Sequence, residues 1–470
     1  MHLEQFYLGC LAHASYLIAD EESGVAVVVD PQRDVDAYIQ KAEAHGWRIE
    51  HVYLTHFHAD FLAGHLELRE RTGATIHLGA RGETEFEVVA ESDGTVLELG
   101  PQVRIEAMET PGHTPEGISL LVYDRRTSDT QPHAVLTGDT LFIGDVGRPD
   151  LLASIGFTQA ELGKMLYHSL HTKLATLPDS TRVYPAHGAG SLCGKNLSDE
   201  TSSTMGEQRR TNYALQPMSE EEFLAVVTAD QPAAPGYFVH DAVLNRKERP
   251  LMDSAVAKGR KALDLETLLA RANAGAQVLD ARDPEAFAAG HLAGSINIGL
   301  DGKFATWAGT VLDLERPILV IAEAGREEEA ILRLGRIGLD LVEGYLDGGA
   351  AAFAERPELQ VRFTRVEAKP LAEELAGEAA PVVLDVRAPG EYGAGHLECA
   401  LHIPLNQLAE RASEVPRDRP VVVHCAGGYR SAIAVSLLER AGIEGLRDLR
   451  GGFGAWSGAG LPVVVPAPTA

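Results

Sequence analysis

The segment YLTHFHADFLAGH, residues 53–65, leaves a β-rich run and enters a helical one. It places His56, His58 and Asp60 on a short loop, where histidines two residues apart can converge on one point. Layered α/β enzymes gather functional side chains at strand ends, because the sheet is rigid and the loops are free to vary. The segment therefore predicts a layered α/β fold with a site at one edge of a sheet.

Working outward from this segment, more strand-end loops carry metal-ligand residue types. TPGHT brings His113, TGDT brings Asp139 and PAHG brings His187. A hydrogen-bonded structural role is the commoner one for a single histidine, and we expect it for His65 and His77, but coincidence does not explain the whole set. Six β-rich runs are expected between residue 1 and about residue 215: 25–29, 52–54, 75–78, 103–108, 134–137 and 182–184.

Composition excludes several classes of partner. The formal net charge of -27 repels nucleic-acid phosphates and anionic membranes. The first ten residues, MHLEQFYLGC, lack the features of a signal peptide, and no apolar run reaches the roughly 18 residues that span a bilayer. Four cysteines in 470 residues are too sparse for a disulfide framework, so we expect a reducing, cytoplasmic compartment.

The motifs THFHAD, TPGHT, TGDTLF and PAHG resemble, in order and spacing, those of the metallo-β-lactamase superfamily over roughly residues 1–215. The resemblance implies an αββα fold. In the superfamily's binuclear zinc hydrolases, such as glyoxalase II, the first motif reads HxHxDH, and Phe61 stands here in place of its last histidine. A phenyl ring cannot bind a metal, so a single metal ion is expected.

Two histidines and one carboxylate are the ligand set of non-haem iron(II) oxygenases. By resemblance to the persulfide dioxygenases that are fused to rhodaneses, one iron(II) is implied, with His56, His113 and Asp139 as ligands. Three residues are expected just outside the ligand set: His58, Asp60 and His187. The first of them stays open as a ligand, because the hydrolases of the superfamily use its equivalent to bind metal.

Residues 144–151, 187–195 and 206–213 match the same fusions and are expected to line the substrate side of the site. Arg148 can offer its planar fork to a substrate carboxylate or form an ion pair with Asp150, and both roles stay open. Cys193 can touch substrate or be a buried, inert thiol.

A duplication follows a mixed stretch, residues 231–260, which we interpret as a connecting arm. VLDARDPEAFAAGHLAGSINIGL, ending at Leu300, matches VLDVRAPGEYGAGHLECALHIPL, ending at Leu405, at a constant offset of 105 residues. Both copies predict parallel βαβ packing. The expected domains are residues 1–240 with the arm, 262–358 and 366–470.

The second copy contains VVVHCAGGYRS, residues 421–431, in which Cys425 ends a strand and faces a helix N-terminus. Loop N–H groups and the helix dipole stabilise a thiolate there. The CxxGxR spacing resembles single-domain rhodaneses and implies that Cys425 accepts a sulfane sulfur, while Arg430 and the loop orient an anionic donor or acceptor such as thiosulfate or sulfite. Three loop residues are expected to bind that substrate: Gly427, Gly428 and Tyr429.

The first copy has Ala322 at the place of the cysteine and Glu327 at the place of Arg430. It retains no nucleophile, and its three consecutive glutamates repel anions, so a structural or docking role is expected. Cys10 and Cys399 are expected to be inert.

Taken together, the resemblance implies a persulfide dioxygenase that uses O2 to convert a low-molecular-weight persulfide into sulfite, coupled to a rhodanese that forms or consumes thiosulfate. A homo-oligomer is expected, with the cysteine-free repeat as a plausible interface. Two alternatives stay open: a glyoxalase II-type thioester hydrolase, which Phe61 disfavours, and a sulfur carrier with a vestigial first domain, which the intact ligand set disfavours.

Overall fold

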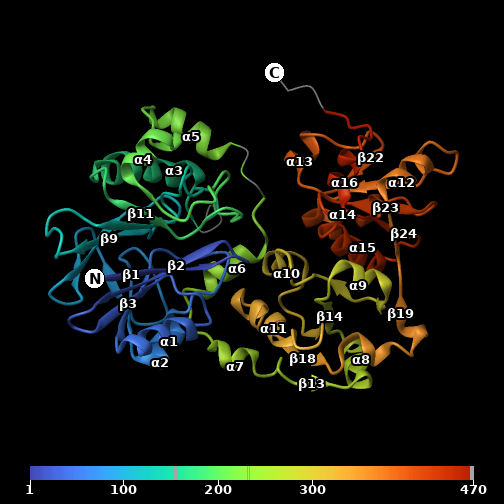
Figure 1. The fold of residues 1–470 in the computed structure, drawn as a ribbon, viewed down its shortest axis with the longest axis horizontal. Helices are drawn as coiled ribbons and strands as arrows, with labels where there is room; N and C mark the ends of the chain where they lie inside the picture. The colour runs from blue at the N-terminus through green and yellow to red at the C-terminus, as the bar shows by residue number, and fades with distance from the viewer. Residues whose placement is uncertain (152–155, 230, 232, 466–470) are drawn as a thin grey trace. The chain divides into compact units, whose positions relative to one another are not determined.

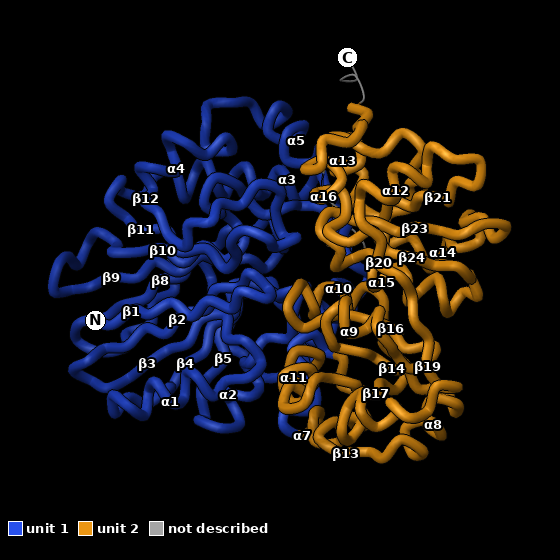
Figure 2. Tube along the Cα trace, turned by 45° about the vertical axis from the view of Figure 1, so that its right-hand side comes forward, with its two compact units in different colours: residues 1–253, 335–338 blue, residues 254–334, 339–470 orange. Residues whose placement is uncertain are grey.

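The structure, a computed structural model, describes residues 1–151, 156–229, 231 and 233–465. Residues Met1–Asp253 and Gly335–Gly338 form one compact unit, and Ser254–Leu334 and Leu339–Ala470 form the second (Figure 2). Residues 466–470 of the expected last domain lie outside the described residues. None of the helices in the described ranges has the length and apolar composition that crossing a membrane requires.

Unit 1 has four layers, with two six-stranded sheets face to face between two layers of helices (Figure 1). The core between the sheets takes side chains from both, including Tyr16 and Leu136. Helices α1 (Asp36–His45) and α2 (His65–Thr72) pack on the first sheet. Helices α3 (Gln159–His168), α4 (Met205–Thr211) and α5 (Glu220–Thr228) pack on the second. The expected αββα fold is thus confirmed.

All six β-rich runs expected from the sequence form strands. The first sheet has the spatial order β1 (His2–Leu8), β2 (His13–Asp20), β3 (Val25–Val29), β4 (Arg48–Leu54), β5 (Thr75–Gly79), β6 (Val89–Glu91). The second has the order β12 (Ser203–Thr204), β11 (Arg182–Pro185), β10 (Ala134–Gly138), β9 (Ile118–Asp124), β8 (Val103–Glu109), β7 (Val96–Glu98). Strands β8, β10 and β11 run in one direction, so the loops that follow them meet at one edge.

The stretch 231–260 is more than the connecting arm that we expected. It contains helices α6 (Tyr237–Leu244) and α7 (Met252–Val256). Asn245 and Arg249, which follow α6 in the sequence, donate to the carbonyls of Phe61 and Ala63. The Pro- and Gly-containing composition of the stretch gave no sign of these two short helices, the first of which buries Tyr237 and Phe238.

Unit 2 contains two parallel five-stranded sheets with the same topology, which fits the duplication. The first has the order β13 (Ala262–Leu263), β18 (Val342–Leu346), β17 (Ile318–Ile321), β14 (Gln277–Asp280), β16 (Ile296–Asn297). The second has the order β20 (Thr364–Val366), β24 (Leu446–Leu449), β23 (Val421–His424), β21 (Val382–Asp385), β22 (Ala400–His402). A short ladder pairs β15 (His291–Leu292) with β19 (Gln360–Val361).

The helices of unit 2 also follow the repeat. Those of the first copy are α8 (Leu265–Asn273), α9 (Pro284–Ala289), α10 (Phe304–Val311) and α11 (Glu327–Arg336), whose last residues belong to unit 1. Those of the second are α12 (Ala368–Leu375), α13 (Pro389–Gly393), α14 (Leu408–Arg411), α15 (Arg430–Arg440) and α16 (Gly452–Gly458).

Each copy closes the end of its second strand with the same buried ion pair. Asp280 lies 2.5 Å from Arg282, and Asp385 lies 2.6 Å from Arg387. Each guanidinium also donates to a glycine carbonyl eight residues onward. Charge-assisted bonds of this kind fix the turn after the strand, so both copies keep one framework.

Candidate metal centre and sulfur-transfer loop

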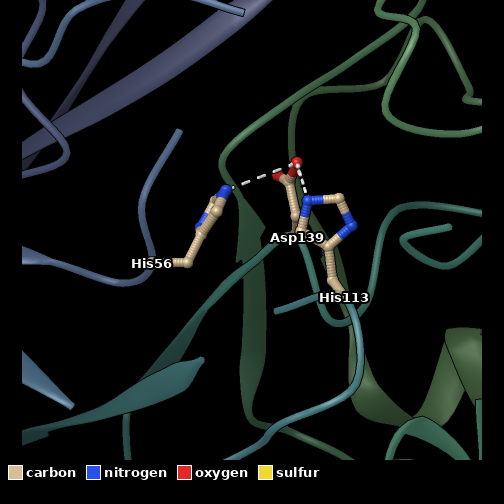
Figure 3. Close-up of side chains that lie close together, drawn as sticks. All are labelled: His56, His113 and Asp139. Carbon is tan, nitrogen blue, oxygen red and sulfur yellow. Dashed lines mark ion pairs between the residues drawn. The ribbon is translucent and has the colours of Figure 1, made fainter. Parts of the chain in front are cut away.

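The loops after β4, β8 and β10 bring His56, His113 and Asp139 together (Figure 3). One oxygen of Asp139 lies 3.7 Å from Nε2 of His56 and 3.5 Å from Nε2 of His113. All three side chains are buried. Ligand atoms bound to one metal at about 2.1 Å lie roughly 3 to 3.5 Å apart, so the three donor atoms fit a shared ion.

The back of each histidine is held by an oxygen atom. Nδ1 of His56 lies 2.9 Å from the hydroxyl of Thr55, which donates to Asp30 at 2.7 Å. Nδ1 of His113 donates to the Arg148 carbonyl at 2.9 Å. Such outer bonds fix the ring and leave Nε2 free to bind metal. Asp30 and Thr55 were not expected from the sequence motifs, although Asp30 also follows a strand.

Two backbone features support this chain of bonds. Asp30 has a φ of 49°, which is uncommon for any residue but glycine. Its carboxylate accepts from both the N–H and the hydroxyl of Thr55, which holds the strained turn in place. Gly138 precedes Asp139, and a Cβ there would lie 2.5 Å from the Thr55 hydroxyl, so only glycine fits.

Beside this centre lies a second buried group, formed by His58, Asp60 and His187. His187 donates from Nδ1 to Asp139 at 2.7 Å, and its Nε2 lies 3.0 Å from Asp60. His58 lies 3.1 Å from Asp30. His187 thus contacts Asp139 directly, and Asp60 contacts His187. His58 contacts Asp30, which supports His56 through the Thr55 hydroxyl.

Burial and charge work against each other in this region. Burial alone would raise the pKa of Asp139, but the adjacent His187 and His56 hold it far below its ordinary value. Burial lowers the pKa of His56 and of His113. Burial would also lower the pKa of His187, yet Asp139 and Asp60 raise it well above its ordinary value. The centre therefore combines a carboxylate with two neutral imidazoles, which are the protonation states that metals bind.

The centre opens onto a small hollow that His56, His113 and Asp139 line together with a mostly hydroxyl-bearing wall. The remaining lining residues are Thr55, Thr110, Thr114, Gly117, Ile118 and Thr140. The hollow lies beside the three donor atoms, and the hydroxyls of Thr55 and Thr110 in its wall already bond to Asp30 and Ser119.

Two residues assigned to substrate binding have other partners. Arg148 is buried, donates to both oxygens of Asp150 at 2.7 and 2.6 Å, and reaches the Leu192 carbonyl. Its fork is thus occupied by the ion pair that we kept as the alternative. Cys193 is buried near the centre, and burial with the charges of Asp60 and Asp139 raises its pKa well above the ordinary value. The raised pKa disfavours the thiolate form of Cys193.

Residues far along the chain hold the metal loop from behind. The Asn245 side-chain oxygen accepts from the Ala63 N–H at 2.9 Å. Its amide nitrogen donates to the carbonyls of His58 and Phe61, both at 2.8 Å. One buried side chain thus satisfies three backbone groups of the loop. The mixed composition around Asn245 gave no signal for this role.

The second candidate site is the loop from Cys425 to Arg430 at the end of β23. Sγ of Cys425 accepts from the Gly428 N–H at 3.1 Å, and the cysteine side chain is only 1% exposed. Gly428 has a φ of 97°, which favours glycine. Gly427 is exposed at the loop tip. The loop therefore gives the sulfur one backbone N–H donor, the kind of group that stabilises an anion, and the Ser431 hydroxyl lies 3.6 Å from the sulfur.

Two other loop residues differ from a simple substrate-binding role. Arg430 donates to both oxygens of Glu391 at 2.6 and 2.7 Å. Tyr429 donates its hydroxyl to the Gly299 carbonyl of the first repeat at 2.7 Å. Neither Glu391 nor Gly299 was expected as a partner from the sequence. An incoming anion must therefore share Arg430 with Glu391.

An αββα fold with a buried His, His and Asp cluster at its strand ends, joined to a strand-end cysteine loop, defines a class of metal-dependent enzymes with a sulfur-transfer module. The Metallo-beta-lactamase superfamily profile matches residues 8–187, and the Rhodanese-like domain profile matches residues 264–356 and 367–459.

Named relatives agree with both matches. The mitochondrial persulfide dioxygenase ETHE1 of Bos taurus is 32% identical over 45% of this chain and 75% of its own length. The cytoplasmic hydroxyacylglutathione hydrolase of Arabidopsis thaliana is 35% identical over 39% of this chain and 66% of its own. A sulfurtransferase of Allochromatium vinosum is 37% identical over 22% of this chain and 94% of its own.

Among solved structures, a metallo-beta-lactamase from Staphylococcus aureus is 31% identical, with a TM-score of 0.66 over 73% of this chain and 98% of its own. The chain therefore belongs to the metallo-β-lactamase superfamily as a fusion with two rhodanese-like domains, and its homologues include persulfide dioxygenases and rhodanese sulfurtransferases.

Proposed function

We propose that the chain is a persulfide dioxygenase that binds one iron(II) at His56, His113 and Asp139 and transfers sulfur at Cys425. The observation that carries the proposal is the convergence of those three donor atoms while Phe61 fills the place of a further ligand. Two imidazoles and a carboxylate with open positions suit iron(II). The similarity to a persulfide dioxygenase supports the same reading.

The overall reaction is RSSH + O2 + H2O → RSH + sulfite + 2 H⁺. Iron(II), when bound, supplies the redox chemistry and holds both reactants in reach of each other. The protein positions the donors, since Thr55 and the Arg148 carbonyl fix the two rings. The three donor side chains are buried, so a substrate that reaches them is shielded from bulk solvent.

At the second site, sulfite attacks the outer sulfur of a Cys425 persulfide. The S–S bond breaks, its electron pair returns to Cys425, and thiosulfate leaves; the reverse reaction loads the cysteine from thiosulfate. The Gly428 N–H stabilises the thiolate that forms.

We propose that the protein works as a homo-oligomer, and light scattering that shows a monomer would refute this.

The experiment measures oxygen uptake with glutathione persulfide on protein loaded anaerobically with iron, together with sulfite and thiosulfate. His113→Ala is expected to lose oxygen uptake, while the exposed His133→Ala keeps it. Cys425→Ser is expected to keep oxygen uptake and lose thiosulfate formation, while the exposed Cys399→Ser keeps both. Absence of oxygen uptake with several persulfides would refute the dioxygenase assignment.

A second candidate is a thioester hydrolase with two metal ions. Its support is the nearby group of His58, Asp60 and His187, together with the similarity to hydroxyacylglutathione hydrolases. Zinc-loaded protein that holds two ions per chain and hydrolyses a hydroxyacylglutathione would favour this function over the first.

A further inference from the structure

The arginine of the sulfur-transfer loop is paired with a carboxylate. In the sequence, Arg430 lies between two residues that contact the sulfur of Cys425. The Gly428 N–H donates to that sulfur at 3.1 Å, and the Ser431 hydroxyl lies 3.6 Å from it. Both arms of the Arg430 fork donate to Glu391, at 2.6 and 2.7 Å. A planar fork of this kind is what binds a carboxylate or sulfonate in two places at once, and Glu391 already uses both.

The guanidinium of Arg365, which also contacts the loop, is paired as well. It donates to the Gly428 carbonyl at 3.4 Å. It also donates to Asp448 at 2.7 Å and to Glu285 at 2.8 Å. A doubly charged anion that approaches the loop is therefore repelled by carboxylates that hold the two arginines, and this repulsion offsets part of the attraction of the guanidinium groups.

The pair of Arg430 with Glu391 is not needed for the framework of the module. At the constant offset of 105 residues, the first copy has Ala286 at the place of Glu391, and it has Glu327 at the place of Arg430. That copy nevertheless forms a sheet of the same topology. The copy that bears the cysteine has both members of the pair and the copy without the cysteine has neither, which points to a role in the chemistry of the loop.

We propose that Glu391 determines the specificity of the sulfur-transfer site, because it competes with dianions for Arg430 and shifts the sulfur donor of Cys425 from thiosulfate toward a thiol persulfide. This inference rests on the proposed sulfur transfer at Cys425. Glu391 acts through Arg430 and is a positioning residue.

The two donors differ in the charge that they bring to the loop. With a thiol persulfide, RSSH, the Cys425 thiolate attacks the outer sulfur, the S–S bond breaks, and its electron pair leaves with RS⁻, so that the cysteine becomes a persulfide. With thiosulfate, the same attack transfers the outer sulfur and releases sulfite with the electron pair. Only the second donor places a dianion beside the carboxylate of Glu391.

The exposure of the pair sets the size of the expected effect. The Arg430 side chain is 20% exposed and that of Glu391 is 37% exposed. Water therefore screens the charges in part, and ion pairs of this kind change an equilibrium by roughly two- to fivefold.

The test measures thiocyanate formation by the full chain, with cyanide as acceptor and either thiosulfate or mercaptoethanol persulfide as donor. Oxygen is excluded so that the metal centre does not consume the persulfide, and Cys425→Ser gives the uncatalysed background. Glu391→Gln is expected to lower the KM for thiosulfate roughly two- to fivefold and to leave the KM for the persulfide and both kcat values nearly unchanged. The glutamine can still accept from the Ala388 N–H at the start of α13, as Glu391 does at 3.0 Å.

A matched control is available in the same repeat. Glu414 accepts from two nitrogens of Arg411 at 2.7 and 2.8 Å and is exposed. Glu414→Gln therefore removes the same charge from the same kind of pair, and its KM values are expected to equal those of the parent.

A second measurement does not depend on turnover. Iodoacetate and iodoacetamide alkylate a thiolate in the same way but differ in charge, and mass spectrometry follows the reaction at Cys425 alone. Glu391→Gln is expected to speed the reaction with iodoacetate and not that with iodoacetamide, and added salt is expected to shrink the difference. An iodoacetamide rate equal to that of the parent shows that the loop keeps its structure.

The outcomes separate this inference from the function on which it rests. Thiocyanate formation from thiosulfate that persists in Cys425→Ser would refute sulfur transfer at that cysteine. If Cys425→Ser is inactive while Glu391→Gln matches Glu414→Gln in both KM values and in reagent preference, the role of Glu391 is overturned and the sulfur-transfer function stands. An equal fall in the KM for both donors would overturn it too, because the choice between them would not have changed.

Discussion

The ring of Phe61 packs on the ring of His13, with their centroids 4.1 Å apart, and its centroid also lies 4.4 Å from that of His58. All three side chains are buried. The position where the superfamily's binuclear hydrolases carry a histidine is thus an apolar wall beside two imidazoles. This contact gives the proposed single-metal stoichiometry a structural cause that can be tested.

Phe61→His is expected to raise the metal content from about one ion per chain toward two, because it restores a ligand beside Asp60 and His187. Oxygen uptake with persulfide is expected to fall. Elemental analysis of the reloaded protein measures the change, and Phe61→Leu, which adds no ligand, is the control. An unchanged metal content in Phe61→His would show that the ring does not set the stoichiometry.

Thr55→Val is expected to weaken metal binding by roughly 10- to 100-fold, the usual cost of losing an outer-shell partner. The change removes the hydroxyl between Asp30 and His56 and keeps the side-chain shape. Competition with a chelator measures the affinity. An affinity equal to that of the parent would mean that His56 is oriented without this hydroxyl.

Asn245→Ala is expected to lower the free energy of unfolding of unit 1 by about 2 to 4 kcal/mol, because it leaves three buried backbone groups without partners. Metal loss should accompany the change, since the loop carries His56. Urea unfolding and metal content measure the two effects. Asn273→Ala, at an exposed position in α8, is the control, and equal effects of both substitutions would contradict the role.

The free energy of unfolding of the second repeat is expected to depend on pH because of Asp448. Burial raises its pKa to about 6, in spite of the adjacent Arg365. Between pH of about 4 and 6 the folded protein holds this proton more tightly than the unfolded chain, so the free energy of unfolding falls as pH rises and stays lower above that interval. The loss attributable to Asp448 is at most about 3 kcal/mol.

The measurement is urea unfolding followed by Trp456 fluorescence, in a chain whose Trp47 and Trp307 are replaced by phenylalanine. Asp448→Asn is expected to remove this part of the pH dependence. Parallel profiles for the parent and Asp448→Asn would show that the carboxyl group titrates at the same pH in both states.

The strand ends and their metal-binding residue types could be predicted from the sequence, because alternating apolar runs and short motifs are local signals. Asp30 and Thr55 carry no such motif, although Asp30 ends the run VAVVVD and so had a detectable position. Asn245 was beyond reach, since it is nearly 190 residues from His58 in sequence. Its role depends on tertiary packing, which no local pattern encodes.

The duplication could also be predicted from the sequence, because the two copies match at a constant offset and therefore share one topology. What could not be predicted is which surfaces the two copies share. The hydroxyl of Tyr429 donates to the carbonyl of Gly299. A glycine in a loop does not predict such a contact, because isolated glycines occur in many loops for other reasons. The partner of Arg430 was likewise hidden, although Glu391 lies in the repeated motif.

The Asp280–Arg282 and Asp385–Arg387 pairs have a consequence for how this chain can change over time. Each pair secures the turn of its copy. A gene duplication that leaves such a framework intact lets one loop lose its nucleophile without unfolding the module. The first copy is then free to acquire another role, while the second keeps its cysteine loop.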